Sequence, residues 1–482
     1  MATTNEHHDV MGSAFAANET VQASIEAILS ELKTAQASMT GARPPREGTT
    51  ETYEGWLQRA AEVRGRPCLY PYIGSGFGNG PLVELADGSV KWDMINGIGV
   101  HMFGHSHPEM VRAQLEAGLS DVCMEGNLQF NADMVELCEL LVTEAAKGSN
   151  IAHCFMTNSG AMANESALKV CQQKTGGAPR ILAFNDCFMG RSTTMAQIGD
   201  SAGGRMGIPL NALIDYLPYY DELDGPASAC HALQRLNEYI KRYPGQHSCC
   251  IFELVQGEGG FTVAPRDFFV PLMERCKEAG IPVWSDEVQT FGRTDAMFRY
   301  QGLDLGQYVD VTTIGKMSQV CAALYTEEFN PKAGLLSGTF ASSTSAFRCG
   351  LAALSTLRDG GYYGPTGRIA ELQNAWREHC AALIEAHPEF FPPVVDELGR
   401  NSDQFVSGTG GMMRLTPFGG DRAKIMKSLH ALFKHGVIAF ICGHGPYHLR
   451  FLAPIGVMEP EQFAPIFEIM TAAFAETHAS GD

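Results

Sequence analysis

Basic residues are scarce in this chain relative to acidic ones. The 482 residues include 35 Lys and Arg against 54 Asp and Glu, which gives a formal charge of −19. A nucleic-acid-binding protein would carry a basic face, so this deficit argues against that class. No apolar run approaches the roughly 20 residues that a membrane-spanning helix needs. The polar N-terminus, MATTNEHHDV, also lacks the basic-then-apolar pattern of a secretory signal.

Paired cysteine motifs are also missing. The 14 cysteines form no C-x-x-C pair, and the adjacent Cys249 and Cys250 cannot easily bridge to each other. In a chain of this length, scattered cysteines are typical of reduced, buried thiols. His105 and His107 are only two possible ligands, so they are a weak indication of a metal site. We therefore expect a cytoplasmic protein with neither a disulfide framework nor a bound metal.

Short apolar runs recur between residues 150 and 320, with helical spacing between several of them. The runs are IAHCFMT (151–157), RILAF (180–184), CCIFELV (249–255), IPVWSD (281–286) and VDVTTIG (309–315). Buried strands that alternate with helices predict an α/β fold with a large, mostly parallel sheet covered on both faces. Because such sheets bind ligands outside the carboxyl ends of their strands, the residues directly after these runs are the functional candidates.

The two ends of the chain have a different pattern. Residues 21–33 place their apolar side chains on one helix face, and Asp87-Gly88 separates two short apolar runs as in a hairpin. A last helix is predicted from Phe463 to Phe474. We predict an N-terminal segment (1–100) contributing to a small domain, a large domain (101–350) and a smaller C-terminal α+β domain (351–482).

Three of the predicted strands end next to residues with distinctive chemistry. Ser159-Gly160-Ala161 opens the helix after the first run, and the N-terminus of a helix attracts anions. Phe188 follows the second run, where an aromatic ring could stack on a planar ligand. Asp286 ends the fourth run, and a buried carboxylate is costly unless it is paired. Ordinary alternatives are a strand-to-helix turn, core packing, and a salt bridge from Asp286 to Arg293 or a helix cap.

Lys316 follows the fifth run directly. A desolvated lysine has a lowered pKa and can attack carbonyl groups, although a lysine whose stem lies along apolar surface is an equal alternative. Considered together, an anion site, an aromatic ring, an acid and a lysine at the ends of one sheet suit a phosphorylated aromatic aldehyde held as a Schiff base.

Six ordered motifs resemble those of the class III aminotransferases, which are pyridoxal-phosphate enzymes of fold type I. The strongest is SDEVQTFGRT (285–294), close to the family's D-E-V-Q-T-G-F-G-R-T. The others are MFGHSHPEM (102–110), TNSGAMANESALK (157–169), CFMGRST (187–193), FELVQGEGG (252–260) and HLRFLAP (448–454). This resemblance implies pyridoxal 5'-phosphate as the cofactor, bound by a large, mostly parallel sheet domain beside a smaller α+β domain.

The resemblance also implies a role for each matching residue. Lys316 would form the Schiff base and later move the substrate proton, and Asp286 would pair with the pyridine nitrogen. The other cofactor-binding residues would be Ser159, Gly160 and Ala161 at the phosphate, Phe188 and Val288 on the two faces of the ring, Gln289 near the phenolic oxygen, and Thr339 from the neighbouring subunit. The role of Thr339 implies a homodimer with shared active sites, and pairing of dimers into tetramers stays open.

Two further positions match substrate-binding residues. Arg450 matches an arginine that binds a substrate carboxylate, for which a planar guanidinium is suited. Glu258 matches a glutamate that pairs with this arginine in members acting on ω-amino acids. We hypothesise a switch in which Glu258 neutralises Arg450 while the donor presents a distal amine, and the pair opens when 2-oxoglutarate arrives.

Several positions depart from the family pattern, among them Met162, Met189 and the stretch 341–344. None of them replaces Lys316 or Asp286, so we predict an aminotransferase. It would move an amino group from an amino acid or amine, preferably an ω-amino acid or diamine-type donor, to a 2-oxo acid such as 2-oxoglutarate. An aminomutase or epimerase would share the same cofactor residues. A non-catalytic binding protein is a further alternative, against which the intact lysine and acid argue.

Overall fold

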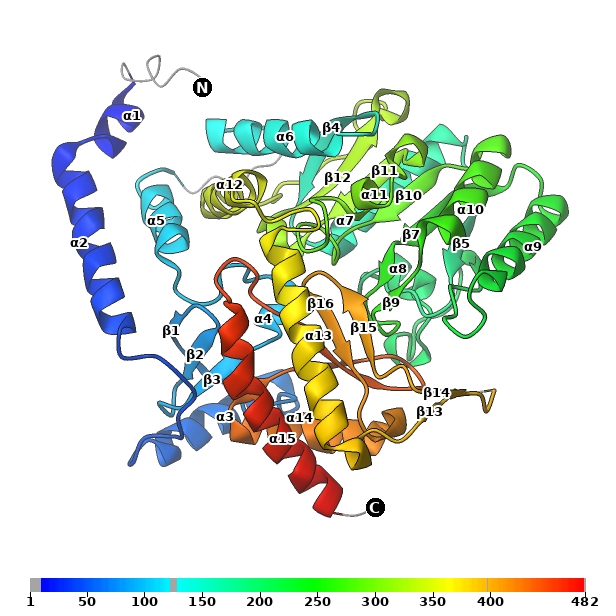
Figure 1. The fold of residues 1–482 in the computed structure, drawn as a ribbon. Helices are drawn as coiled ribbons and strands as arrows, with labels where there is room; N and C mark the ends of the chain where they lie inside the picture. Colours follow the sequence, from blue (N-terminus) through cyan, green and yellow to red (C-terminus); the bar gives the residue numbers. More distant parts are fainter. Residues whose placement is uncertain (1–9, 122–127, 397, 481–482) are drawn as a thin grey trace.

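The computed structural model describes residues 10–121, 128–396 and 398–480. The first nine residues of the polar N-terminus lie outside this description. Figure 1 shows a large body around a central sheet and a second body built from the two ends of the chain. None of the described helices is both long and apolar enough to cross a membrane.

A seven-stranded sheet forms the centre of the large body (Figure 1). Its strand order is β4 (Ile151–Thr157), β12 (Cys321–Thr326), β11 (Val311–Ile314), β10 (Val283–Asp286), β7 (His247–Glu253), β5 (Arg180–Phe184) and β6 (Leu213–Leu217). Neighbouring strands are parallel, except that β12 is antiparallel to both of its neighbours. Every residue of β10 and β11 is buried, so both faces of the sheet are covered there. The predicted α/β fold is confirmed.

Helices pack against this sheet and against one another beside it. They are α6 (Ala132–Ala145), α7 (Gly160–Lys174), α9 (Ala227–Arg242), α10 (Arg266–Glu278) and α12 (Thr344–Asp359). The start of α7 is set by Ser159, whose Oγ accepts the N–H of Met162 at 3.2 Å, a side-chain cap of the usual kind. The helix then buries Ala163, Ala167 and Val170 at helical spacing.

A smaller antiparallel sheet lies in the C-terminal part of the chain. Its order is β15 (Val406–Thr409), β16 (Met412–Leu415), β19 (His448–Leu452) and β18 (Phe440–Cys442). Helices α13 (Arg368–Ala386) and α14 (Arg422–His435) pack against it, and α15 (Phe463–Ala479) packs against these two helices. Arg450 is paired in register with Arg414 on one side and Phe440 on the other, so these three side chains lie on one face of the sheet.

The N-terminal part of the chain joins residues from near its end. The predicted hairpin is present as β2 (Leu82–Leu85) and β3 (Val90–Asp93), and the predicted first helix as α2 (Glu19–Gln36). Their sheet is completed by β1 (Gly74–Asn79) and by β17 (Val437–Ile438), which runs parallel to β3. The division of the chain at residues 100 and 350 stays a prediction.

The remaining elements are short or peripheral. The helices are α1 (Met11–Ala16), α3 (Thr50–Arg64), α4 (Asn96–Gly99), α5 (Pro108–Ala117), α8 (Thr193–Ile198) and α11 (Arg299–Gly302). The strands are β8 (Val255–Gln256), β9 (Thr262–Val263), β13 (Val394–Val395) and β14 (Asn401–Ser402).

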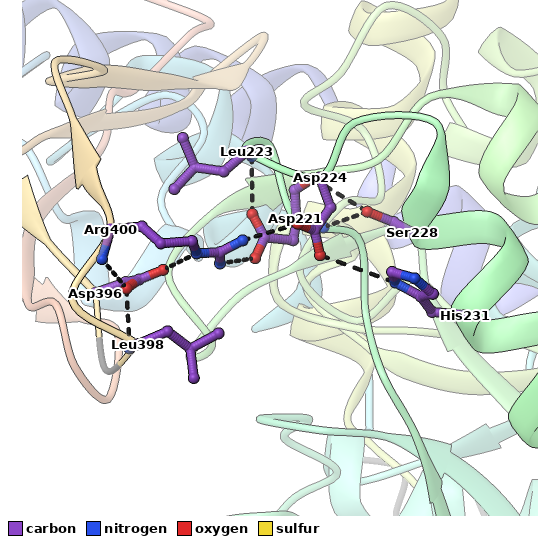
Figure 2. A network of polar contacts seen from close by, with 8 residues as sticks. All are labelled: Asp221, Leu223, Asp224, Ser228, His231, Asp396, Leu398 and Arg400. Carbon is purple, nitrogen blue, oxygen red and sulfur yellow. Dashed lines mark hydrogen bonds and ion pairs between the residues drawn. The ribbon is translucent and has the colours of Figure 1, made fainter.

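An ion-pair network joins the loop after β6 to the segment before β14 (Figure 2). The guanidinium of Arg400 lies 2.5 Å from Asp221, 2.8 Å from Asp224 and 2.6 Å from Asp396. Asp221 and Asp224 belong to the large body, whereas Arg400 and Asp396 belong to the C-terminal part. The network therefore fixes the two parts of the chain to each other at the surface.

Candidate active site

A cavity of about 300 Å³ lies at the carboxyl ends of β5, β7, β10 and β11. Its walls contain many of the residues that the sequence singled out: Gly160, Ala161, Phe188, Glu258, Asp286, Val288, Gln289 and Lys316. Ser159 directly precedes the wall residue Gly160, and Arg450 forms a hydrogen bond with the wall residue Glu258. Thr339 is not part of the wall and is exposed in the single chain.

Asp286 is the last residue of β10 and is buried. Its Oδ2 accepts a hydrogen bond from Asn164 Nδ2 at 2.8 Å, and its Oδ1 accepts one from the N–H of Val288 at 2.9 Å. Burial raises the pKa of Asp286 to about 6. Among the residues that the structure describes, Asp286 forms no ion pair with Arg293, which instead donates to the carbonyl of Gly99. Held only by neutral donors, Asp286 retains the capacity to pair with a cation.

Lys316 follows β11 and lies in the cavity wall. Its φ of 56° is in the left-handed region, where a residue with a Cβ is strained. Burial, followed by the nearby charge of Arg293, lowers the pKa of Lys316. A lysine in this setting loses its proton more readily than one in water, which makes its amine a nucleophile toward carbonyl carbons.

The N-terminus of α7 forms one end of the cavity. The N–H groups in the first turn of a helix have no intrahelical acceptor and bind anions, and Gly160 and Ala161 both line the cavity there. A Cβ on Gly160 would lie 2.8 Å from Val288 Cγ1, closer than carbon atoms approach. Glycine is therefore needed at position 160 for α7 to reach the wall formed by Val288.

The rest of the wall suits a flat polar ligand. Phe188 and Val288 supply apolar surface, and Gln289 is pressed against Gly257, where a Cβ would collide with its side-chain amide. The Oε1 atom of Gln289 and the Oδ1 atom of Asn164 are buried without a hydrogen-bond partner within the described ranges. An anion site, an acid, a nucleophilic amine and unpaired polar atoms around apolar walls fit pyridoxal phosphate.

Arg450 on β19 reaches the cavity through Glu258. Its Nη2 donates to Glu258 Oε1 at 2.7 Å, while its Nε and Nη1 have no partner among the described residues. The arginine side chain is 0% exposed and that of Glu258 is 28% exposed. The guanidinium also lies 5.0 Å from the ring centroid of Phe440. Buried, unpaired N–H groups are costly, and a carboxylate bound at Nη2 together with Nη1 or Nε would satisfy one of them.

Two residues of this site were missed by the sequence analysis. Asn164, which donates to Asp286, lies one helical turn after Gly160, and this spacing could have placed it on the same face of α7. Glu253 is the last residue of β7 and is paired in register with Asp286. The criterion that identified Asp286, an acid at the end of a buried strand, applies equally to Glu253.

Comparison with known proteins agrees with this geometry. Residues 75–474 match the family model described as aminotransferase class-III. The chain belongs to this family. Class III aminotransferases depend on pyridoxal phosphate, so the family, the enzyme class and the cofactor that the resemblance implied are confirmed.

Similar proteins include the acetylornithine aminotransferase of Corynebacterium efficiens, which is 33% identical over 55% of this chain and 63% of that enzyme. The 5-aminovalerate aminotransferase of Pseudomonas putida is 28% identical over 84% of this chain and 95% of its own length. Among solved structures, the lysine aminotransferase of M. tuberculosis superposes with a TM-score of 0.72 at 21% identity, covering 87% of this chain and 98% of its own. This likeness confirms the fold-type-I architecture.

Proposed function

We propose that this class III aminotransferase transfers an amino group from an ω-amino acid or diamine-type donor to a 2-oxo acid such as 2-oxoglutarate. The observation that carries the proposal is Arg450, which uses only one of its three guanidinium nitrogens to bind Glu258, beside the cavity that Lys316 and Asp286 line. The three similar enzymes named above act on acetylornithine, 5-aminovalerate and lysine, each of which carries an amine remote from its carboxylate. This shared feature supports a donor of the same kind here.

Different residues around the cavity would bind different parts of pyridoxal phosphate. The cofactor supplies an aldehyde for the amine and a ring that withdraws electrons from the breaking bond. Lys316 would hold the aldehyde carbon and move the proton at the substrate carbon that bears the amine, and Asp286 would keep the ring nitrogen protonated. The remaining roles would be phosphate binding by Ser159, Gly160 and Ala161, ring packing by Phe188 and Val288, and contact with the phenolic oxygen by Gln289.

Glu258 and Arg450 would select between the two substrates. With an amine donor in the cavity, Glu258 neutralises Arg450 and leaves no free cation near the amine. With 2-oxoglutarate in the cavity, its carboxylate takes Nη2 of Arg450 together with the adjacent Nη1 or Nε, and the displaced, partly exposed Glu258 turns toward solvent. A planar guanidinium is suited to both partners because it presents two parallel N–H pairs.

A second copy of the chain would complete the site. Thr339 is exposed in the single chain, next to Phe340, which is 47% exposed. Leu128 and Phe130 are 96% and 60% exposed, and the side chain of Asn131 donates to Thr344 at 3.0 Å, so the two segments meet. Exposed apolar side chains on these two segments support a homodimer in which Thr339 reaches the partner's phosphate site. We place this dimer in the cytoplasm.

A donor screen tests the proposal. The purified protein with pyridoxal phosphate is incubated with 2-oxoglutarate and single amines or amino acids, and glutamate is measured. We expect glutamate from donors with a terminal amine, and none with Lys316→Ala. Many turnovers of the donor per enzyme without any 2-oxo acid would instead indicate an aminomutase or epimerase. The absence of a yellow absorbance band that borohydride bleaches, or its survival in Lys316→Ala, would point to a binding protein.

A further inference from the structure

Glu253 connects two loops that both line the cofactor cavity. Its Oε2 accepts the N–H of Phe188 at 3.0 Å, and its Oε1 accepts the N–H of Gly257 at 3.3 Å. Its backbone carbonyl accepts the hydroxyl of Tyr219 at 2.8 Å, which holds the end of β7 in place. A single side chain thus bonds both to the turn after β5 and to the loop after β7.

Each of these loops contributes to the proposed site. Phe188 forms part of the cavity wall, and Gly257 directly precedes Glu258, the partner of Arg450. Positions 257, 259 and 260 are all glycine, so the backbone of this loop has little stiffness of its own. On its far side, the carbonyl of Glu258 accepts the N–H of Gly443 at 2.8 Å. Glu253 and Gln256, whose Nε2 donates to the carbonyl of Asn185 at 2.5 Å, therefore anchor the near side of this glycine loop.

Charge pairing does not account for Glu253. Glu253 lines the cavity, and no Lys, Arg or His in the described part of the chain forms an ion pair with it. The acid Asp286 is its register partner on β10. Burial, followed by the charge of Asp286, raises the pKa of Glu253 to about 8. A second acid in this position is electrostatically costly, so its hydrogen bonds to the two loops are what it contributes.

We propose that Glu253 is a positioning residue for transamination. It holds Phe188 in the cavity wall, and it anchors the loop of residues 257–260 while Glu258 moves onto and away from Arg450. The proposal rests on the proposed function for the role of Glu258. Glu253 itself need not touch the substrate. Its loss would weaken retention of the cofactor, because Phe188 is no longer held, and use of the 2-oxo acid, because Glu258 is no longer positioned.

The test compares Glu253→Ala, Glu253→Gln and, as a matched control, Glu54→Gln on the exposed surface of α3. The rate of pyridoxal phosphate release after dilution and the KM and kcat with 2-oxoglutarate are measured. Alanine removes both acceptors, so release and KM should each rise about fivefold to tenfold, the factor expected for one lost buried hydrogen bond, with a smaller change in kcat. Glutamine keeps one acceptor oxygen and should restore part of the loss.

The proposal would be overturned if Glu253→Ala released the cofactor at the wild-type rate and kept the wild-type KM. It would also be overturned if both quantities rose equally in Glu253→Gln and Glu253→Ala. If the alanine variant does not fold, Glu253→Gln tests the proposal through cofactor release and KM, because the glutamine side chain keeps only one of the two acceptor oxygens. A wild-type protein that forms no glutamate from any donor would refute the proposed function instead. Cofactor release from the variants would then still report whether Glu253 holds Phe188.

Discussion

Arg450 and Glu258 form an ion pair with unequal partners. The arginine is fully buried with two unpaired nitrogens, whereas the glutamate is 28% exposed and makes one bond to it. Moving the glutamate requires little rearrangement, because it lies in a glycine-rich loop and already contacts solvent. Moving the arginine would disturb β19 and the sheet around it. The glutamate is therefore the mobile member of the pair.

Glu258→Ala is expected to separate the two half-reactions. With an ω-amine donor, Arg450 would be left unneutralised beside the substrate amine, and the rate of that half-reaction should fall about tenfold or more. The half-reaction with 2-oxoglutarate should change little, because its carboxylate replaces Glu258. Single-turnover rates of both halves provide the measurement.

Glu222→Ala is the matched control for this variant. Its carboxylate lies 3.7 Å from Arg414, the register partner of Arg450 on β16, so an acid is likewise removed from a buried arginine. This change should leave the ratio of the two half-reaction rates unaltered. If Glu258→Ala left both rates unchanged as well, the switch would be refuted.

Gly160→Ala should weaken cofactor binding. The new Cβ would collide with Val288 at 2.8 Å and push the N-terminus of α7 away from the cavity, which would cost the N–H contacts to phosphate. We expect the dissociation constant of pyridoxal phosphate to rise about tenfold. The double variant Gly160→Ala/Val288→Ala removes the colliding methyl groups and should recover part of the affinity. No recovery would mean that the collision is not the cause.

Lys316 variants should report the strain at its backbone. At a φ of 56°, glycine pays no steric penalty and alanine does. Among inactive variants, Lys316→Gly should therefore be more stable to urea than Lys316→Ala by about 1 kcal/mol, opposite to the usual order of these residues. Equal stability, or a more stable alanine variant, would show that the left-handed conformation is not maintained.

Glu253 should make the cofactor-free protein less stable as the pH rises. Its pKa is raised from an ordinary glutamate value to about 8, so the folded state binds more protons than the unfolded state between these values. Stability is then lost with rising pH, by up to about 1.4 kcal/mol per pH unit for one group. Between about pH 6.5 and about pH 8, Glu253→Gln should lose less stability in urea than the wild type. Parallel profiles would contradict this assignment.

Much of the large sheet could be read from apolar runs. The runs at 180–184 and 281–286 contain β5 and β10, because strands buried on both faces are continuously apolar. The run at 151–157 coincides with β4, although only three of its seven residues are buried. β6 was missed because Asp215 interrupts its pattern, and its carboxylate pairs with Arg180 and hydrogen-bonds to His247 only in the folded chain. β12 was missed as well, since its small residues give a weak signal and its antiparallel direction is not visible in sequence.

The sequence by itself determined the family and the cofactor chemistry through its ordered motifs. It also predicted Lys316 and Asp286 as the catalytic lysine and acid, because one follows an apolar run and the other ends one. Only the tertiary structure decided which residues surround them. Parallel strands bring Glu253 into register with Asp286, and the C-terminal sheet brings Arg450 to Glu258 across 192 positions. Such contacts depend on how strands and sheets are arranged in space, which local patterns of polarity do not encode.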